Sequence, residues 1–449
     1  MSNPILDYLE KHLDDAIADL RDLCSIPSVA AKGEHIDEAA QKVMHLLESV
    51  GLETSIHQTS GSPVVTGEID IGANKTLLFY NHYDVQPAEP FDLWETPPFE
   101  MNRRDGRLYG RGVADNKGDL ITRVWALKAF QETNTNLPVN IKFLAEGEEE
   151  IGSPHLNEFV KENRDFLRAD GGIWEFGSTD IDGNQEMWLG LKGLLYVQLE
   201  IERLAMDAHS SYACMLPSAV YRLVWALNSL RNEDNQILID GFYDDVKPLS
   251  KAEQKAIENI NMHEKDVREF YDIPEFLDGM RGIELKKAFY NAPTCNIAGI
   301  DSGWQGSGAK TVLPAKALVK IDFRLVESMR PEDILRKLRN HLDRKGFTDI
   351  RIAWNHGYPA AKTPIGHPFV DIVRKATEQA FGHGPVVHPT SPGSGPLYLF
   401  KGLVPMVSVG CGDFESRVHS PNESILVDNF LKASQRIVAV IQQMEQETF

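Results

Sequence analysis

The sequence predicts an α/β protein with a mostly parallel central sheet, into which a smaller α+β domain is inserted. Apolar strand-like runs alternate with amphipathic helical stretches in the first and last parts of the chain, whereas the middle third follows a β-α-β-β-α-β-like order. A chain of 449 residues is long enough for two domains. We expect the larger domain to span 1–189 and 359–449, and the inserted domain to span 190–358.

The larger domain is expected to begin with two helices, at 5–23 and 36–50, and Gly51 suits the C-terminal cap of the second. Strands and helices then alternate at 76–80, 120–131, 139–144, 154–167 and 172–174. Helix 369–381, strand 405–409 and helix 425–444 complete this domain after the insertion. Polar residues follow several of these strands, and in such sheets functional sites lie at the carboxyl ends of strands.

In the inserted domain the pattern locates strands at 194–202, 313–325 and 349–354 and helices at 217–231 and 331–345. Residues 355–368 are rich in proline and glycine and indicate the linker back to the larger domain. The segment 232–290 is charged and partly helical, at 251–261, and the pattern does not assign it a place.

The formal net charge of −20 argues against nucleic acid and against an anionic membrane surface as partners, because phosphates would be repelled. Plain solubility is the simpler explanation of this charge. No apolar run approaches the length of a membrane span, and the first residues lack the pattern of a secretory signal. The four cysteines have no CxxC spacing and fit reduced thiols. We therefore expect a cytoplasmic protein.

His82 and Asp84 stand two residues apart after an apolar run, which places both side chains on one face of a strand. The imidazole can then bind a metal ion while the carboxylate holds its tautomer. A strand-end histidine in a polar turn is the alternative. Asp115 lies in a glycine-rich loop, where a carboxylate can bridge two cations or simply cap the next helix.

Glu149 and Glu150 belong to an acidic run that also contains Glu146 and Glu148. Such a run is often a solvated loop. At the end of a strand, however, one glutamate can bind a metal ion while its neighbour takes a proton from water. Glu175 also follows a strand. His419 and His209 are two of 14 histidines, so the order of all these segments is more specific than any one residue.

Five segments resemble one known family: 109–112 (YGRG), 115–118 (DNKG), 149–153 (EEIGS), 306–312 (GSGAKTV) and 323–326 (FRLV). Through these residues the chain resembles the M20 family of co-catalytic metallopeptidases, and the resemblance covers nearly its whole length. It is most similar to the branch that contains cytosolic nonspecific dipeptidase and carnosinase. The resemblance implies a zinc-exopeptidase-like catalytic domain and a ferredoxin-like lid or dimerisation domain.

The resemblance also implies residue roles, and it implies two divalent metal ions per subunit, with zinc expected and manganese or cobalt as alternatives. His82, Asp115 and Glu175 would bind one ion, and Asp115, Glu150 and His419 the other. Glu149 would be the general base and Asp84 the partner of His82. His209 would stabilise the oxyanion in the partner subunit of a homodimer. Arg324 and Ser394 would contact the carboxylate end of a small peptide substrate, and the peptide after Asp115 would be cis.

The sequence departs from the family at two places. Ser211 stands where the family often has glycine, and Glu175 stands where close dipeptidase relatives tend to have aspartate. Hydrolysis of dipeptides or short peptides is the expected activity. An N-acyl-amino-acid amidohydrolase with the same site is the alternative, and an inactive paralogue that serves as a binding protein is a third hypothesis. A strand salt bridge remains the alternative reading of Arg324.

Overall fold

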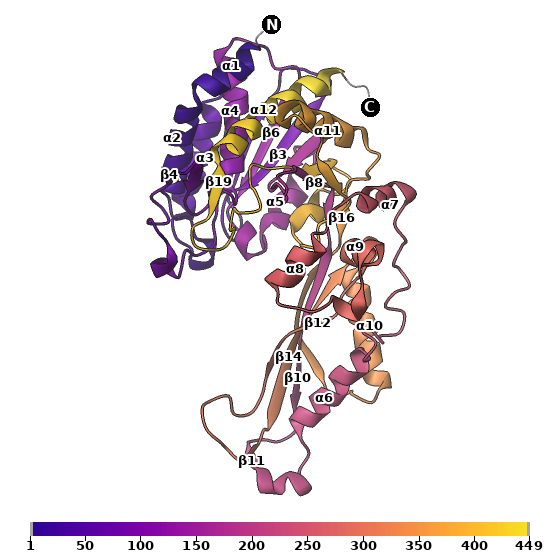
Figure 1. The fold of residues 1–449 in the computed structure, drawn as a ribbon. Helices are drawn as coiled ribbons and strands as arrows, with labels where there is room; N and C mark the ends of the chain where they lie inside the picture. The colour runs from indigo at the N-terminus through magenta and orange to yellow at the C-terminus, as the bar shows by residue number, and fades with distance from the viewer. Residues whose placement is uncertain (1–2, 447–449) are drawn as a thin grey trace. The chain divides into compact units, whose positions relative to one another are not determined.

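The computed structural model describes residues 3–446, which form two compact units (Figure 1). Unit 1 contains the residues up to Gly190, Lys362–Thr390 and the residues from Gly395 onward. Unit 2 contains Leu191–Ala361 and Ser391–Ser394. The short strands β9 (Gly190–Leu191) and β16 (Ala361–Lys362) mark two of the points where the chain passes from one unit to the other, and the others flank Ser391–Ser394.

Unit 1 is built around an eight-stranded sheet with the order β1-β2-β6-β3-β7-β18-β8-β17. Its strands are β1 (Glu53–His57), β2 (Val64–Ile69), β3 (Thr76–His82), β6 (Asn140–Glu146), β7 (Gly171–Trp174), β8 (Glu186–Trp188), β17 (Val386–His388) and β18 (Met406–Ser408). The central strands β6, β3, β7 and β18 run parallel, while β1 and β2 add an antiparallel edge. The predicted α/β class with a mostly parallel sheet is confirmed.

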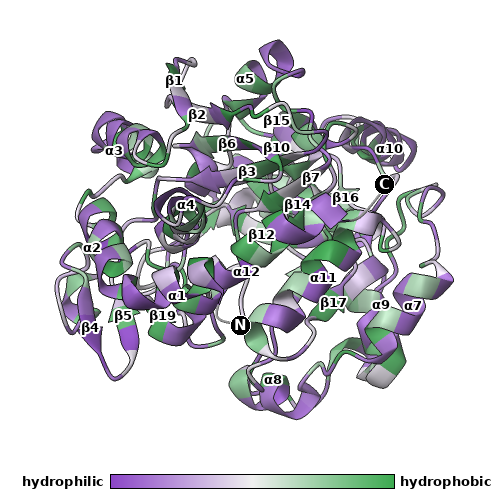
Figure 2. Cartoon of the chain, turned by 90° about the horizontal axis from the view of Figure 1, so that it is seen from above, coloured by the Kyte–Doolittle hydropathy of each residue, from purple (hydrophilic) through white to green (hydrophobic). Residues whose placement is uncertain are grey.

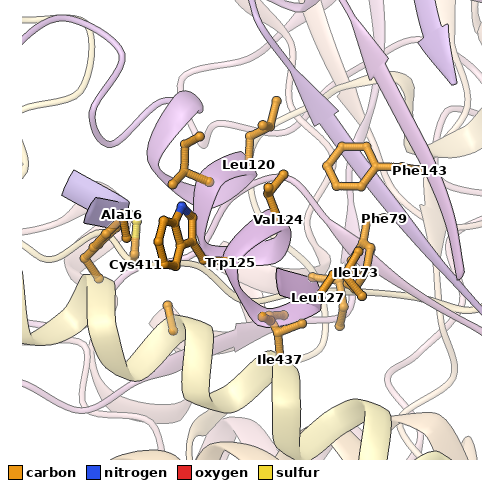
Figure 3. Packing of buried hydrophobic residues seen from close by; sticks show 14 of the residues in the cluster. Ala16, Phe79, Leu120, Val124, Trp125, Leu127, Phe143, Ile173, Cys411 and Ile437 are labelled. Atoms are coloured by element: carbon orange, nitrogen blue, oxygen red, sulfur yellow. The ribbon is translucent and has the colours of Figure 1, made fainter. Parts of the chain in front are cut away.

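The helices of unit 1 are α1 (Pro4–Lys11), α2 (Leu13–Cys24), α3 (Ile36–Glu48), α4 (Lys117–Glu132), α5 (Leu156–Glu162), α11 (Pro368–Phe381) and α12 (Val427–Gln446). All of them except α5 contribute to one apolar core. Figure 3 shows Trp125 and Val124 of α4 beside Ile437 of α12 and Phe79 of the sheet. Burial of this apolar surface is the main force that holds α4 and α12 on the sheet.

The centre of the sheet is covered on both faces. Phe79 of β3 belongs to the core with α4, whereas its neighbour Tyr80 stacks on Trp174 with ring centroids 3.9 Å apart. Phe400 of the 3₁₀ helix η6 (Pro396–Phe400) meets both rings edge-on. A parallel strand that is buried on both faces needs a continuous apolar run, as residues 77–80 have. In β3 the strongly polar side chains, Asn81 and His82, therefore come at the end of the strand.

Two predicted helices of unit 1 differ in the structure. The expected helix 5–23 is two helices, α1 and α2, which meet at His12 with φ −106° and ψ 21°. The apolar stripe continues across this break, so the sequence pattern did not reveal it. The expected helix 154–167 is shorter, because α5 ends at Glu162. In Figure 2 the outer helices α2 and α3 show one hydrophilic and one hydrophobic side.

Unit 2 contains an antiparallel four-stranded sheet with the order β12-β14-β10-β15. Its strands are β10 (Gly193–Glu202), β12 (Asn296–Asp301), β14 (Lys316–Leu325) and β15 (Arg351–Tyr358). Two helices, α6 (Ala219–Leu230) and α10 (Pro331–Arg344), pack on it through alternate buried residues of β10 and β14. With these two helices the order is β-α-β-β-α-β, as in a ferredoxin-like domain.

Three details of unit 2 differ from the sequence pattern. The expected strand 313–325 is interrupted at Pro314, so β13 (Val312–Leu313) is separate and pairs with β11 (Ala208–His209). Proline has no N–H to give to the ladder. Residues 355–358 of the expected linker belong to β15. The unassigned segment 232–290 holds helices α7 (Lys251–Glu258), α8 (Glu264–Phe270) and α9 (Gly282–Asn291).

A small three-stranded sheet in unit 1, with the order β19-β5-β4, joins distant parts of the chain. Its strands are β4 (Asn102–Arg104), β5 (Arg107–Tyr109) and β19 (Ser424–Leu426). Pairing of Ser424 with Tyr109 brings the segment that follows His419 next to the glycine-rich loop that carries Asp115. Within residues 3–446, no helix has both the length and the apolar character that crossing a membrane requires.

Candidate metal centre

The carboxyl ends of three neighbouring strands of unit 1 supply most of the candidate residues. β3 ends at His82, which pairs in register with Glu146 at the end of β6. Glu149 begins the 3₁₀ helix η3 (Glu149–Ile151) just after β6, and Glu175 directly follows β7. Because these strands are parallel neighbours, their polar ends meet at one edge of the sheet.

Asp115 links two imidazoles that come from opposite ends of the chain. Its Oδ1 lies 3.0 Å from Nε2 of His82, and its Oδ2 lies 2.9 Å from Nε2 of His419. His419 Nε2 is also 3.2 Å from Oε2 of Glu150. One donor atom from each of His82, Asp115 and Glu150 falls within a single 4.8 Å cluster. A carboxylate that offers one oxygen to each side has the arrangement of a ligand shared by two cations.

Asp84 is fully buried and holds both the histidine and the glutamate pair. Nδ1 of His82 lies 3.1 Å from the backbone oxygen of Asp84 and 3.3 Å from its Oδ1. The two carboxylate oxygens of Asp84 accept hydrogen bonds from the backbone N–H groups of Glu149, at 3.2 Å, and Glu150, at 3.0 Å. The same carboxylate thus orients the imidazole and the turn that carries both glutamates.

The centre concentrates negative charge that its two histidines do not balance. Burial and the nearby carboxylates raise the pKa of Glu149 to about 8 and raise the pKa of Glu175 well above its usual range. One buried oxygen of Glu150 (Oε1) and one of Glu175 (Oε2) make no hydrogen bond among the described residues. Buried carboxylate oxygens without a donor nearby are what divalent cations would satisfy.

The same negative charges also raise the pKa values of the two imidazoles, which favours their protonated form. Contacts with Asp115 and Glu150 raise the pKa of His419 to about 10. Burial opposes the charged form of His82, but Asp115 and Asp84 together still raise its pKa well above the usual value. Protons on these imidazoles occupy the place that a cation would take, because a metal ligand must be the neutral ring. The donor set fits borderline divalent ions such as zinc, which bind histidine nitrogen and carboxylate oxygen.

Two acidic neighbours that the sequence pattern could assign to a solvated loop are buried instead. Glu146 is 2% exposed and accepts hydrogen bonds from the hydroxyls of Tyr80, at 2.5 Å, and Ser153, at 2.8 Å. Glu148 contacts His155 at 2.9 Å and accepts from the backbone of Ser62. The solvated-loop alternative is therefore wrong for both residues, and the apolar strand directly before them was the signal in the sequence.

The sequence pattern assigned no role to the buried residues that hydrogen-bond to the backbone of this centre. The Asp115–Asn116 peptide is cis, as the family resemblance implied. The Asn116 amide donates to the backbone oxygen of Glu175 at 2.5 Å and accepts a hydrogen bond from Asn81. The Arg123 guanidinium donates to the backbone oxygens of Trp174 and Glu175. Each of these residues is buried and lies in or near a named segment, but no local period reveals its partner.

Three further candidate residues lie in unit 2. Arg324, next to the end of β14, donates from Nη1 to the Ser394 hydroxyl at 2.7 Å. Its nearest carboxylate, Asp322, is 4.0 Å from Nε, so a tight strand salt bridge is not what holds it. His209 is exposed at the end of β11, where Ser211 Oγ lies 2.8 Å from Nδ1 and Thr311 Oγ1 lies 3.1 Å from Nε2. The structure therefore pairs Arg324 with Ser394 and fixes the His209 ring separately.

The sequence pattern of Peptidase family M20/M25/M40 matches residues 78–443. The chain is 30% identical to the Cys-Gly metallodipeptidase dug1 of Schizosaccharomyces pombe, over 95% of each chain. It is 27% identical to the Beta-Ala-His dipeptidase of Mus musculus, over 99% of this chain and 95% of the relative. A crystal structure of the M20 family metallo-carboxypeptidase Sso-CP2 from Sulfolobus solfataricus superimposes with a TM-score of 0.90, at 34% identity over 96% of this chain and 99% of the other.

Proposed function

Because this chain belongs to peptidase family M20/M25/M40, we propose that it hydrolyses the peptide bond of dipeptides at a centre of two divalent metal ions. The observation that carries the proposal is the orientation of the Asp115 carboxylate. One of its oxygens faces His82 and the other faces His419. The relatives that match most of the chain include enzymes named for the dipeptides Cys-Gly and β-Ala-His.

Five residues would hold the ions. One ion would be bound by His82, Asp115 and Glu175, and the other by Asp115, Glu150 and His419. The unsatisfied oxygens of Glu150 and Glu175 support this division. When bound, such ions polarise the scissile carbonyl and lower the pKa of a water molecule to about 7. Zinc suits the mixture of imidazole and carboxylate ligands, and manganese or cobalt would also fit.

Glu149 would move the proton. Burial and the nearby carboxylates raise the pKa of its carboxyl to about 8 in the metal-free protein, and the positive charge of bound ions would favour the carboxylate form that accepts a proton. It would accept a proton from the attacking water and then donate it to the nitrogen of the leaving amine. Asp84 would hold the turn of Glu149 and the ring of His82 in a fixed relation, which its two backbone hydrogen bonds support.

The residues of unit 2 would recognise the substrate. Arg324 can bind a free carboxylate with two parallel hydrogen bonds, and Ser394 would add a third polar contact. His209 would stabilise the oxyanion in the active site of the partner subunit of a homodimer. Exposure of its ring and support from Ser211 and Thr311 favour this assignment over a role in the core. With four free cysteines, we further infer a cytoplasmic enzyme.

A second candidate is the release of C-terminal residues from longer peptides. The 34% identity to a metallo-carboxypeptidase of the same family favours it. Both activities need a free carboxylate next to the scissile bond, so Arg324 and Ser394 do not distinguish them. The dependence of the rate on peptide length does distinguish them, because a dipeptidase must exclude peptides that extend beyond two residues at the N-terminal side.

The test is hydrolysis of a peptide series by metal-free enzyme to which Zn²⁺, Mn²⁺ or Co²⁺ is restored. The series runs from two to five residues with the same C-terminal residue, and includes Cys-Gly, β-Ala-His and one N-acetyl amino acid. We expect metal-dependent cleavage that is fastest for dipeptides. Equal rates along the series would favour the carboxypeptidase, and cleavage of the N-acetyl amino acid alone would favour the amidohydrolase. Activity that does not depend on added metal would refute the two-metal mechanism.

A further inference from the structure

Glu423 holds the glycine-rich loop that presents Asp115. Its Oε1 accepts hydrogen bonds from the backbone N–H groups of Ala114, at 2.9 Å, and Asp115, at 3.1 Å. Its Oε2 accepts from the N–H of Gly112, at 3.0 Å, and from Nη1 of Arg111, at 2.7 Å. The residue is 1% exposed, so water does not compete for these donors. Four donors on one buried carboxylate fix the backbone of the loop.

The position of Glu423 in the chain connects both halves of the centre. It lies four residues after His419 and just before β19, whose first residue, Ser424, pairs with Tyr109 of β5. Its own backbone oxygen accepts from the N–H of Gly110 at 3.0 Å. His419 and Asp115 are 304 residues apart in the sequence. Glu423 is thus the point where the segment of His419 is attached to the loop of Asp115.

We propose that Glu423 is a positioning residue for the metal centre, which keeps Asp115 oriented so that each of its oxygens serves one ion. The inference rests on the two-metal centre proposed above. It implies that loss of Glu423 weakens the binding of both ions together, because Asp115 is the ligand they share. Loss of an outer partner of this kind typically costs about 10–100-fold in metal affinity.

A simple structural ion pair with Arg111 is the competing explanation, and the chain offers a matched control for it. Arg107 and Asp413 form a second buried pair in the same region, with Nη2 of Arg107 2.8 Å from Oδ1 of Asp413. Arg107 also lies in β5 and donates to the Ser424 hydroxyl. Asp413 accepts no hydrogen bond from residues 112–115 among the described contacts. Its loss should therefore affect stability without affecting the orientation of Asp115.

The experiment compares the wild type, E423Q and D413N as metal-free proteins titrated with Co²⁺ or Zn²⁺ against a chromophoric chelator. The visible spectrum of the cobalt-loaded protein and the melting temperature of the metal-free protein are recorded as well. We expect E423Q to bind both ions about 10–100-fold more weakly, with an altered cobalt spectrum. D413N should keep its metal affinity within about twofold of the wild type, even where it melts earlier.

The glutamine in E423Q leaves the charge of Arg111 buried, so the double variant R111M/E423Q is measured in parallel. Removing both partners of a buried pair avoids an unpaired charge. Wild-type affinity for both ions in E423Q or in the double variant would overturn the proposal. Weakening of one ion only, or failure of both variants to fold, would also overturn it. A wild type that binds two ions but cleaves no dipeptide would refute the proposed activity alone.

Discussion

Replacing Glu149 by glutamine should lower the catalytic rate of the metal-loaded enzyme and raise the stability of the metal-free protein. In the metal-loaded protein the amide cannot accept a proton, and general base catalysis supplies about 10²–10⁴-fold of rate. At about 1.36 kcal/mol per tenfold, this loss corresponds to roughly 3–5 kcal/mol of the barrier. In the metal-free protein the same change removes a carboxylate that the fold disfavours, so we expect greater stability.

The sign of the stability change follows from the pKa of Glu149. The folded value of about 8 lies above the ordinary value of 4.5. Between these two pH values the folded protein binds more protons than the unfolded chain, so wild-type stability falls as pH rises through this window. The gap from 4.5 to about 8 sets a ceiling of about 5 kcal/mol. Because the side chain is half-buried and its acidic neighbours titrate with it, we expect E149Q to gain on the order of 1–3 kcal/mol at pH 8.

The assay needs three measurements on E149Q, with E150Q as the matched control. Elemental analysis should find the full metal content in E149Q and a weakened ion in E150Q. Steady-state kinetics should show the rate loss in E149Q, and denaturant unfolding of the metal-free protein at pH 5 and pH 8 should show a stability gain that grows with pH. A fully loaded E149Q with more than a tenth of the wild-type rate would refute Glu149 as the base. A stability difference independent of pH would refute the raised pKa.

The other predictions concern the shared ligand, the second subunit and the substrate carboxylate. Asp115→Ala should remove or severely weaken both ions, and elemental analysis that finds two tightly bound ions would contradict the bridging role. Mixing inactive H209A with inactive E149A should restore part of the activity, since a hybrid dimer has one intact composite site; no recovery under proven subunit exchange would place the whole site in one chain. The enzyme should cleave Ala-Leu but hardly Ala-Leu-amide, and equal rates would argue against a carboxylate clamp. Arg324→Lys should lower kcat/KM for Ala-Leu by about tenfold to a hundredfold, the worth of one or two charged hydrogen bonds, and an unchanged kcat/KM would exclude the guanidinium fork.

The strand ends were predictable from the sequence because the central strands are buried on both faces. Residues 77–80 form a continuous buried run, so the first polar residues after it must lie at the edge of the sheet, where His82 lies. The same reasoning located Glu149 and Glu175 after β6 and β7. The apolar periodicity of the sequence did not reveal where a helix or a strand is interrupted. The apolar stripe continues across His12, where the helix breaks, and alternation continues across Pro314, where the strand breaks.

By itself, the sequence determined the α/β class, the alternating order of elements and the set of polar residues at the strand ends, because burial imposes a local period on each of them. Only the tertiary structure decided which oxygen of Asp115 faces which histidine, and that Glu146 is buried under Tyr80 rather than solvated. It also decided that Glu423 supports the loop of Asp115. These contacts join residues that are far apart in the chain, and Asp115 and Glu423 are 308 residues apart. A hydrogen bond between such distant groups leaves no period in the sequence, because it depends on how whole strands and loops come together.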